Sequence, residues 1–106
     1  MDEPSLDLFP LGRRVVSRNA LAVLGEAGVE PNRLFGRHAA GDWGVIEDKS
    51  WHLNRMAVDA GYGCVASAYE VLGDVRVVIL TQPDRSNTIM ALPNEVERQQ
   101  GGRSPR

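Results

Sequence analysis

His38, His52 and Arg85 are the residues of this chain whose types could carry out a reaction. Two imidazoles held about one phosphate apart can act as general acid and general base on an RNA 2′-hydroxyl, without a metal. Arg85 would then neutralise the charge that develops on the phosphate. In a competing interpretation, His52 is a solvated helix residue and His38 caps the C-terminal end of a helix. A metal-independent ribonuclease therefore stands as one hypothesis for this sequence.

A polar run over residues 37–44 could instead form part of a binding surface. The run holds His38, Asp42, Trp43 and paired glycines, and it lacks the apolar period of a core element. Trp43 could be an exposed anchor for a partner, with Asp42 beside it. Alternatively, Asp42 bonds the backbone of the turn and Trp43 closes the end of the core.

A second polar run, residues 81–88, has the composition of a turn between two strands. Asp84 and Ser86 flank Arg85 and could hold its guanidinium ready for a phosphate or a carboxylate. The same residues could equally satisfy the turn by bonding nearby backbone. Both alternatives stay open at the level of sequence.

Charge and composition narrow the choice of partner. The net charge of −2 argues against a nucleic-acid binder that works by bulk electrostatics. We therefore expect a protein partner first and RNA second. Sequence-specific DNA binding is disfavoured because the second expected helix is short and contains Gly36. Oligomeric state is left open.

The sequence also bears on metal sites, cofactor sites and cellular location. The acids and histidines lack metal-ligand spacing, and no phosphate-binding glycine loop is present, so we expect neither metal nor cofactor. No apolar run approaches the roughly 18 residues of a membrane span, which predicts a cytoplasmic protein without membrane contact. The single cysteine, Cys64, lies in an apolar strand-like run and is expected to be buried.

The elements that must position these residues follow from periodicity and end signals. Ser17 suits a helix N-cap and Gly28 a left-handed stop, Pro31 suits a first helical position, and Asp48 suits a second N-cap. From Gly63 onward the apolar period changes from about 3.6 to about 2. The expected elements are a strand at 13–16, helices at 18–27, 31–40 and 49–60, and strands at 65–71, 75–81 and 88–92.

This order predicts an α+β domain over residues 11–94. Two to three N-terminal helices would pack on one face of a three- to four-stranded antiparallel meander. The third helix would turn Trp51, Met56, Ala57 and Ala60 inward. The run 77–80 is apolar on both faces, so its strand is expected to be central and covered on both sides. Residues 1–10 are expected to form a loose arm, and 95–106 a disordered tail.

With these residues in view, the chain resembles a group of small bacterial proteins carried on plasmids and other mobile elements. The resemblance spans about residues 11–95, and some members of the group are labelled as type I restriction-modification subunits. A chain of 106 residues without a cofactor-binding glycine motif cannot hold a methyltransferase domain. The resemblance rests on Arg37-His38-x-x-Gly41-Asp42-Trp43-Gly44, Asn54, Ser67-Ala68-Tyr69, Asp84-Arg85-Ser86-x-Thr88 and Leu92-Pro93.

The resemblance implies one departure and one analogy of fold. The group has an acid two places before the Asp-Arg-Ser run, where this chain has Gln82. If that acid were a catalytic base, this member would be inactive or altered. The order of helices followed by sheet is similar to barnase-like and RelE-like ribonucleases, an analogy of architecture alone.

The leading hypothesis is a non-enzymatic accessory protein of a bacterial mobile element that binds a macromolecular partner, most simply a protein. The alternative is a small metal-independent ribonuclease, toxin-like in action, with His38, His52 and Arg85 as its catalytic set. The residues expected at the binding surface are His38, Asp42, Trp43, Asn54, Asp84, Arg85 and Ser86.

Overall fold

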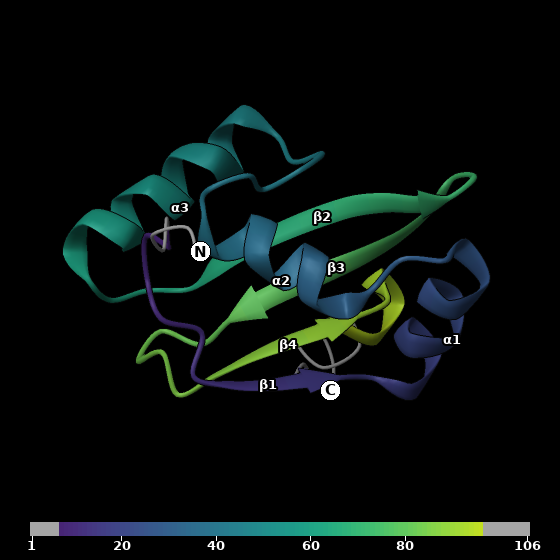
Figure 1. Ribbon diagram of the computed structural model, residues 1–106. Helices are drawn as coiled ribbons and strands as arrows, with labels where there is room; N and C mark the ends of the chain where they lie inside the picture. The colour runs from purple at the N-terminus through teal and green to yellow at the C-terminus, as the bar shows by residue number, and fades with distance from the viewer. Residues whose placement is uncertain (1–6, 97–106) are drawn as a thin grey trace, which may run out of the picture.

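The computed structural model describes residues 7–96 and has the predicted α+β class (Figure 1). Within that range the predicted helices and strands all form, with small shifts at their ends, and residues 93–96 add a helical turn. The elements are β1 (Arg13–Val16), α1 (Arg18–Ala27), α2 (Pro31–Ala39), α3 (Asp48–Ala60), β2 (Val65–Leu72), β3 (Val75–Thr81) and β4 (Asn87–Ala91).

The helix ends follow the predicted signals closely. The Ser17 side chain accepts a hydrogen bond from the Ala20 amide at 3.0 Å, and Gly28 ends α1 in the left-handed region. Pro31 opens α2. At α3, Glu47 rather than Asp48 is the N-cap residue, and Asp48 lies in the first turn, where its charge suits the helix dipole.

The sheet is mixed, with strand order β1-β4-β3-β2. β2, β3 and β4 form the predicted antiparallel meander, whereas β1 pairs with β4 in parallel. The expectation of a purely antiparallel sheet was therefore wrong in this detail. Parallel neighbours need a long crossover connection, and three helices and two strands separate β1 from β4 along the chain.

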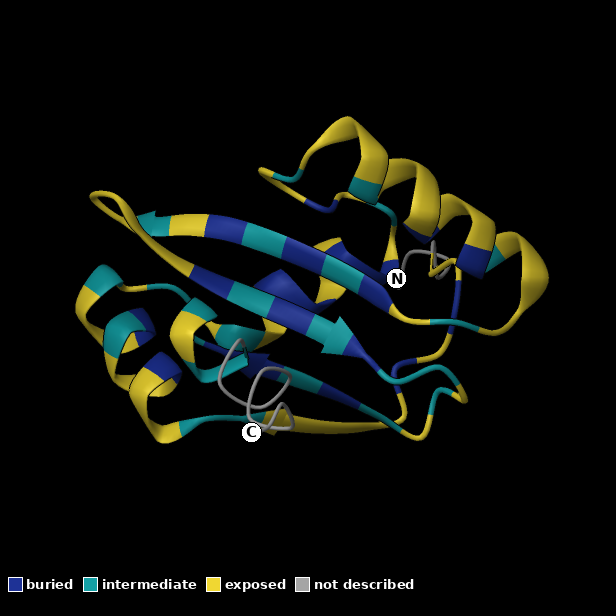
Figure 2. Cartoon of the chain, turned by 180° about the vertical axis from the view of Figure 1, so that it is seen from behind, coloured by how far each residue is buried: buried dark blue, intermediate teal, exposed yellow. Residues whose placement is uncertain are grey.

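The core lies between one face of the sheet and the helices. α2 crosses in front of the sheet in Figure 1 and behind it in Figure 2. Alternate strand residues point into this layer, as the period of 2 predicts. The core cluster contains Ala20 and Leu24 of α1, Leu34 and Phe35 of α2, and Val65, Tyr69, Val77, Ile79 and Met90 of the sheet.

The second face of the sheet is less covered than expected. β3 is central, as predicted, and its Val77 and Ile79 are buried under the helices. On the opposite face, Val78 and Leu80 are only half-buried, and Figure 2 shows the alternation along the strands. The prediction that β3 is covered on both faces was therefore only partly correct: the helices cover one face, and the other face is partly exposed.

α3 faces the core with a different stripe from the one predicted. Asn54 and Ala57 are its buried residues, whereas Trp51 is 42% and Met56 65% exposed. Ala60 is also exposed. The prediction was right for Ala57 and wrong for the other three residues. The helix lies against the outer strand β2, and the polar Asn54 occupies that contact in place of an apolar side chain.

The two ends and Cys64 also differ from expectation where they are described. Residues 1–6 of the expected arm and 97–106 of the expected tail lie outside the described residues. Phe9, placed in the arm by sequence, is buried in the core, and Glu95, placed in the tail, lies in the helical turn over residues 93–96. Cys64 is exposed, because it precedes β2 rather than lying within it.

Gly44 and Gly61 offer a matched test of backbone packing. Gly44 has φ +72°, and an added Cβ would lie 2.0 Å from the Ala68 carbonyl oxygen; Gly61 has φ +74° with open space around it. We expect Gly61→Ala to lower the free energy of unfolding by about 1 kcal/mol, from the left-handed conformation alone. Gly44→Ala should lower it by more than about 3 kcal/mol. Equal losses in denaturant unfolding would contradict the packing described for Gly44.

Candidate functional site

His38 is completely buried, and both of its ring nitrogens have hydroxyl partners. Nδ1 lies 2.6 Å from the Ser67 Oγ on β2, and Nε2 lies 2.9 Å from the Thr81 Oγ1 at the end of β3. The ring of Phe9 packs edge-on against the imidazole at 5.4 Å between centroids. The residue that sequence placed at a helix end is therefore a polar centre inside the core.

The hydroxyl network beyond His38 sets the direction of its hydrogen bonds. Thr88 donates to the Leu11 carbonyl at 2.7 Å, and its Oγ1 lies 2.8 Å from that of Thr81. Since the Thr88 proton is committed to a carbonyl, Thr81 donates to Thr88, and Nε2–H of His38 donates to Thr81. Nδ1 of His38 then accepts from Ser67. Each hydrogen bond of this network therefore has a fixed direction, and the imidazole is neutral.

Burial keeps His38 in that neutral form. Desolvation lowers the pKa of His38 from 6.5 to about 3. A second ring proton would also meet the donating Ser67 hydroxyl. A general acid or base must reach the proton that it transfers, and His38 exposes no surface to a substrate.

His52 lies in a different environment, on the exposed side of α3. Its ring contacts Trp51 edge-on at 5.4 Å between centroids, and Trp51 in turn contacts Trp43. The structure therefore does not bring the two histidines together in one accessible site. The acid–base pair of the ribonuclease hypothesis has no geometric support.

The loop that contains Asp42 and Trp43 is held by its own residues. Trp43 is only 2% exposed, and its Nε1–H donates to the His38 carbonyl at 3.0 Å. The Asp42 carboxylate accepts two hydrogen bonds from Arg37, at 2.7 and 3.2 Å, and this pairing lowers the pKa of Asp42. Trp43 thus closes the end of the core, as the structural alternative proposed.

Tyr69 joins this loop to the sheet. Its hydroxyl donates to the Asp42 carbonyl at 2.7 Å, and the Arg37 guanidinium lies 4.6 Å from the centre of its ring. Desolvation raises the pKa of Tyr69 to about 12, so the phenol remains a donor at neutral pH.

Asn54 acts on the backbone of β2. Its amide donates to the Ala66 carbonyl at 2.7 Å and accepts from the Ala66 amide at 3.0 Å. The same edge is covered at Ala68, whose carbonyl accepts from Val45 and whose amide donates to the Trp43 carbonyl. Asn54 and the loop before α3 therefore replace a neighbouring strand along this edge.

Arg85 is occupied by backbone carbonyls. It donates to the carbonyls of Ala57 at 3.0 Å, of Pro83 at 3.1 Å and of Gly63. Its guanidinium also lies 5.4 Å from the centre of the Phe9 ring. Arg85 adopts φ 65°, a conformation that L-residues rarely take, and the carbonyl contacts hold it there. It ties the β3–β4 turn to the end of α3 rather than being presented to an anion.

Asp84 and Ser86 are exposed and complete the same turn. The Asp84 Oδ1 accepts from the Ser86 amide at 2.9 Å, and hydrogen bonds to Ser86 lower the pKa of Asp84. The backbone of Gln82 bonds to Asn87 and Arg85 across the turn. Gln82, where the resembled group has an acid, thus lies at the start of this turn, directly after Thr81.

Sequence reasoning named His38 but missed what surrounds it. Ser67, Thr81 and Thr88 occupy inward positions of three neighbouring strands, where alternation would place apolar residues. Three inward hydroxyls near one histidine are a readable signal of a buried polar network. Among residues 7–96, no cluster of three or more acids, histidines or cysteines is arranged to hold a metal.

Comparisons with known proteins add no family to this description: no family model, curated protein or solved structure matches the chain. None of the helices in the described part of the chain is long and apolar enough to cross a membrane.

The buried His38 predicts a stability that depends on pH. Because its pKa is lowered on folding, the unfolded chain binds the extra proton first, and stability present above pH 6.5 is lost as the pH falls toward 3. Between pH 6.5 and about pH 5 we expect the free energy of unfolding to fall by about 1.5 kcal/mol. Urea titrations across this interval measure it, above the range in which carboxylates protonate.

His38→Gln should flatten that dependence, while His52→Gln, which also removes a histidine, should retain it. If His38→Gln does not fold, the imidazole proton resonances of the unmodified protein decide the matter. A His38 resonance that titrates above pH 5 would contradict the buried neutral ring.

Proposed function

We propose that this protein is a non-enzymatic accessory protein that binds a protein partner through the second face of its sheet. The observation that carries the proposal is an apolar surface that the described part of the chain covers only in part. Strand pairing places Val15, Ile89, Leu80 and Ala66 in one row across the four strands, and Ala91, Val78 and Ala68 in the next. Surfaces of this kind on small proteins commonly serve association.

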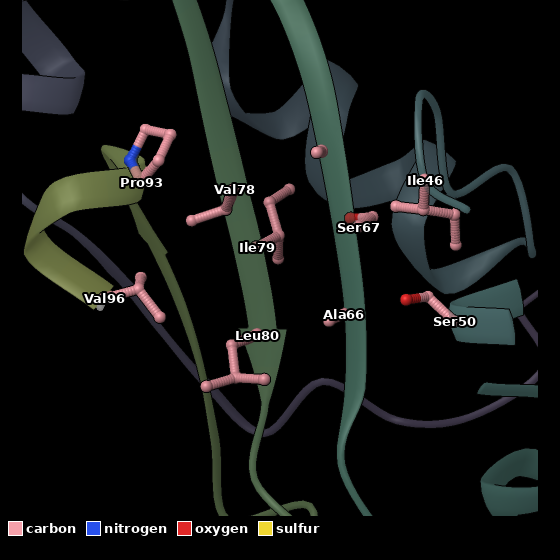
Figure 3. Close-up of a pocket in the computed structure, with 10 residues that line it drawn as sticks. Ile46, Ser50, Ala66, Ser67, Val78, Ile79, Leu80, Pro93 and Val96 are labelled. Carbon is pink, nitrogen blue, oxygen red and sulfur yellow. The ribbon is translucent and has the colours of Figure 1, made fainter. Parts of the chain in front are cut away.

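The surface is shaped as a groove rather than a plane. A hollow of about 280 Å³ lies over β2 and β3, with Ile46 and Ser50 on one side and Pro93 and Val96 on the other (Figure 3). The small side chains of Ala66 and Ala68 form the floor beside β3. Val96 also borders a second hollow, over Val15 and Ile89.

The width of the groove favours an amphipathic helix as its occupant. One wall lies beyond the outer edge of β2 and the other follows β4, so the two are separated by two to three strand spacings, or about 10–15 Å. A helix with its side chains has a diameter of about 10 Å. The raised walls would hold a second flat sheet away from the floor, so a face-to-face dimer fits less well. The floor also lacks the convergent polar groups that orient a small ligand.

Five of the polar residues that sequence assigned to catalysis and binding support the non-enzymatic part of the proposal. His38, Asp42, Trp43, Asn54 and Arg85 each bond to other parts of the same domain. A nucleophile, acid or base needs a free path to substrate, and these side chains are engaged. We place the protein in the cytoplasm, and the resemblance of its motifs suggests a bacterial mobile element as its setting.

The purified protein should leave structured RNA intact in the presence of EDTA. His38 is inaccessible, and Arg85 is bonded to carbonyls, so no acid–base pair with a phosphate clamp is assembled. Labelled RNA run beside His52→Gln and a known ribonuclease measures this. Cleavage that is lost in His52→Gln would restore the ribonuclease hypothesis.

The groove should crosslink to a protein partner in cells. A photoreactive residue at position 50 or 96, in the two walls, should give one defined adduct, and one at Leu21 on the exposed side of α1 should not. Ala68→Arg fills the floor and should abolish the adduct.

With the purified partner, Ala68→Arg should weaken binding by more than about tenfold, and Leu21→Arg should leave it unchanged. Equal effects of the two variants, or adducts from position 21 alone, would overturn the groove as the binding surface.

A further inference from the structure

The two outer edges of the sheet differ in whether their outward backbone groups are hydrogen-bonded. Along β2, Asn54 and the segment from Trp43 to Val45 bond the outward backbone groups of Ala66 and Ala68. Along β1, the opposite edge, the residues from Arg13 to Val15 are exposed. Folds usually protect edges because an unpaired strand invites another strand. Within residues 7–96, the fold protects the β2 edge and leaves the β1 edge open.

The register shows which groups of β1 are free to pair. Arg13 and Ser17 donate their amides to the Ser86 and Met90 carbonyls on the β4 side. In a parallel ladder the alternate residues point the other way. Arg14 and Val16 therefore turn both N–H and C=O outward, which offers an extended chain up to four backbone hydrogen bonds.

Three arginines carry positive charge along this edge. Arg13, Arg14 and Arg18 make no ion pair within the described residues. Arg14 makes a long contact of 3.5 Å to Asn32, and its guanidinium lies 5.8 Å from the centre of the Phe35 ring. The carboxylate of Glu95 lies near the end of β1, where it accepts from Ser17 and Asn19.

Arg18 is the first residue of α1, and the first turn of that helix has no acid. A cation at a helix N-terminus opposes the helix dipole, and the Glu95 carboxylate that accepts from Ser17 and Asn19 offsets part of this cost.

We propose that β1 is a second docking site, at which an extended acidic segment of another protein adds as a fifth strand. The backbone groups of Arg14 and Val16 would pair with the segment, and Arg13, Arg14 and Arg18 would bind its carboxylates. This site is separate from the groove of the proposed function and does not depend on it.

A protein segment suits this edge better than the other occupants. A second copy of the chain would bring two arginine-bearing edges together, which like charges oppose. A nucleic acid would meet the same arginines but has no backbone that continues a β-ladder. The outward N–H and C=O groups therefore favour a peptide, and the arginines favour an acidic one.

A fluorescent peptide of alternating glutamate and valine is the probe that tests the proposal. We expect saturable binding to the full-length protein, none by the lysine–valine peptide, and none by a glutamate–valine peptide whose alternate amides are N-methylated. Arg13→Glu with Arg18→Glu should weaken binding by more than about tenfold and Arg55→Glu, on α3, should not. Binding of the N-methylated peptide at full strength would mean charge alone and would overturn strand addition.

Val16→Pro removes one outward N–H and leaves the ladder to β4 intact, so it should abolish peptide binding. Val16→Ala, which loses the side chain only, should retain it. In the unmodified protein, the Arg14 and Val16 amides should become protected from hydrogen exchange when the peptide binds. Unchanged exchange at both positions, or self-association through β1, would overturn the proposal whatever the variants do. Failure of the groove to crosslink would contradict the proposed function but not this proposal, because the two sites are tested separately.

Discussion

A histidine inside this small core must remain neutral and must have a partner for each ring nitrogen. His38 meets both conditions through Ser67 and Thr81, and the chain of hydroxyls continues through Thr88 to the Leu11 carbonyl. The network joins α2 to three strands and to the segment before β1. Desolvation makes an unpaired polar group in such a place expensive, so the register of these strands and the seat of α2 depend on it.

Two loops next to this network, the one after α2 and the β3–β4 turn, connect the helices to the sheet. The Trp43 indole bonds the His38 carbonyl, and the loop after α2 then runs along β2, where Gly44 permits close approach to Ala68. Asn54 completes that edge. Arg85 performs the corresponding task at the other end of α3, where it collects carbonyls from three segments. Polar side chains that could bind a ligand or transfer a proton are thus used to hold the domain together, and among the described residues the apolar groove and the β1 edge are the surfaces that we propose for partners.

The architecture illustrates why a similar layout does not imply a shared activity. Helices packed on a meander resemble small ribonucleases in outline, yet here the histidine that could act as a base is a buried structural group. What distinguishes the two cases is accessibility: a catalytic imidazole needs contact with solvent and substrate, and a core imidazole excludes both. Burial of the His38 ring therefore argues against one of the two hypotheses that the residue types alone permit.

The sequence by itself determined the local elements of the described chain. Ser17, Gly28, Pro31 and Gly61 mark helix ends by conformational preferences that act over a few residues, and the period of 2 identified the strands.

Only the tertiary structure decided which side chains are buried and which meet. Asn54 faces inward on α3 because it bonds the edge of β2. β1 pairs with β4 in parallel because the three helices and two strands between them form a long crossover connection. His38 met Ser67 and Thr81 across 29 and 43 residues of chain. Such contacts depend on long-range register, which local propensity does not encode.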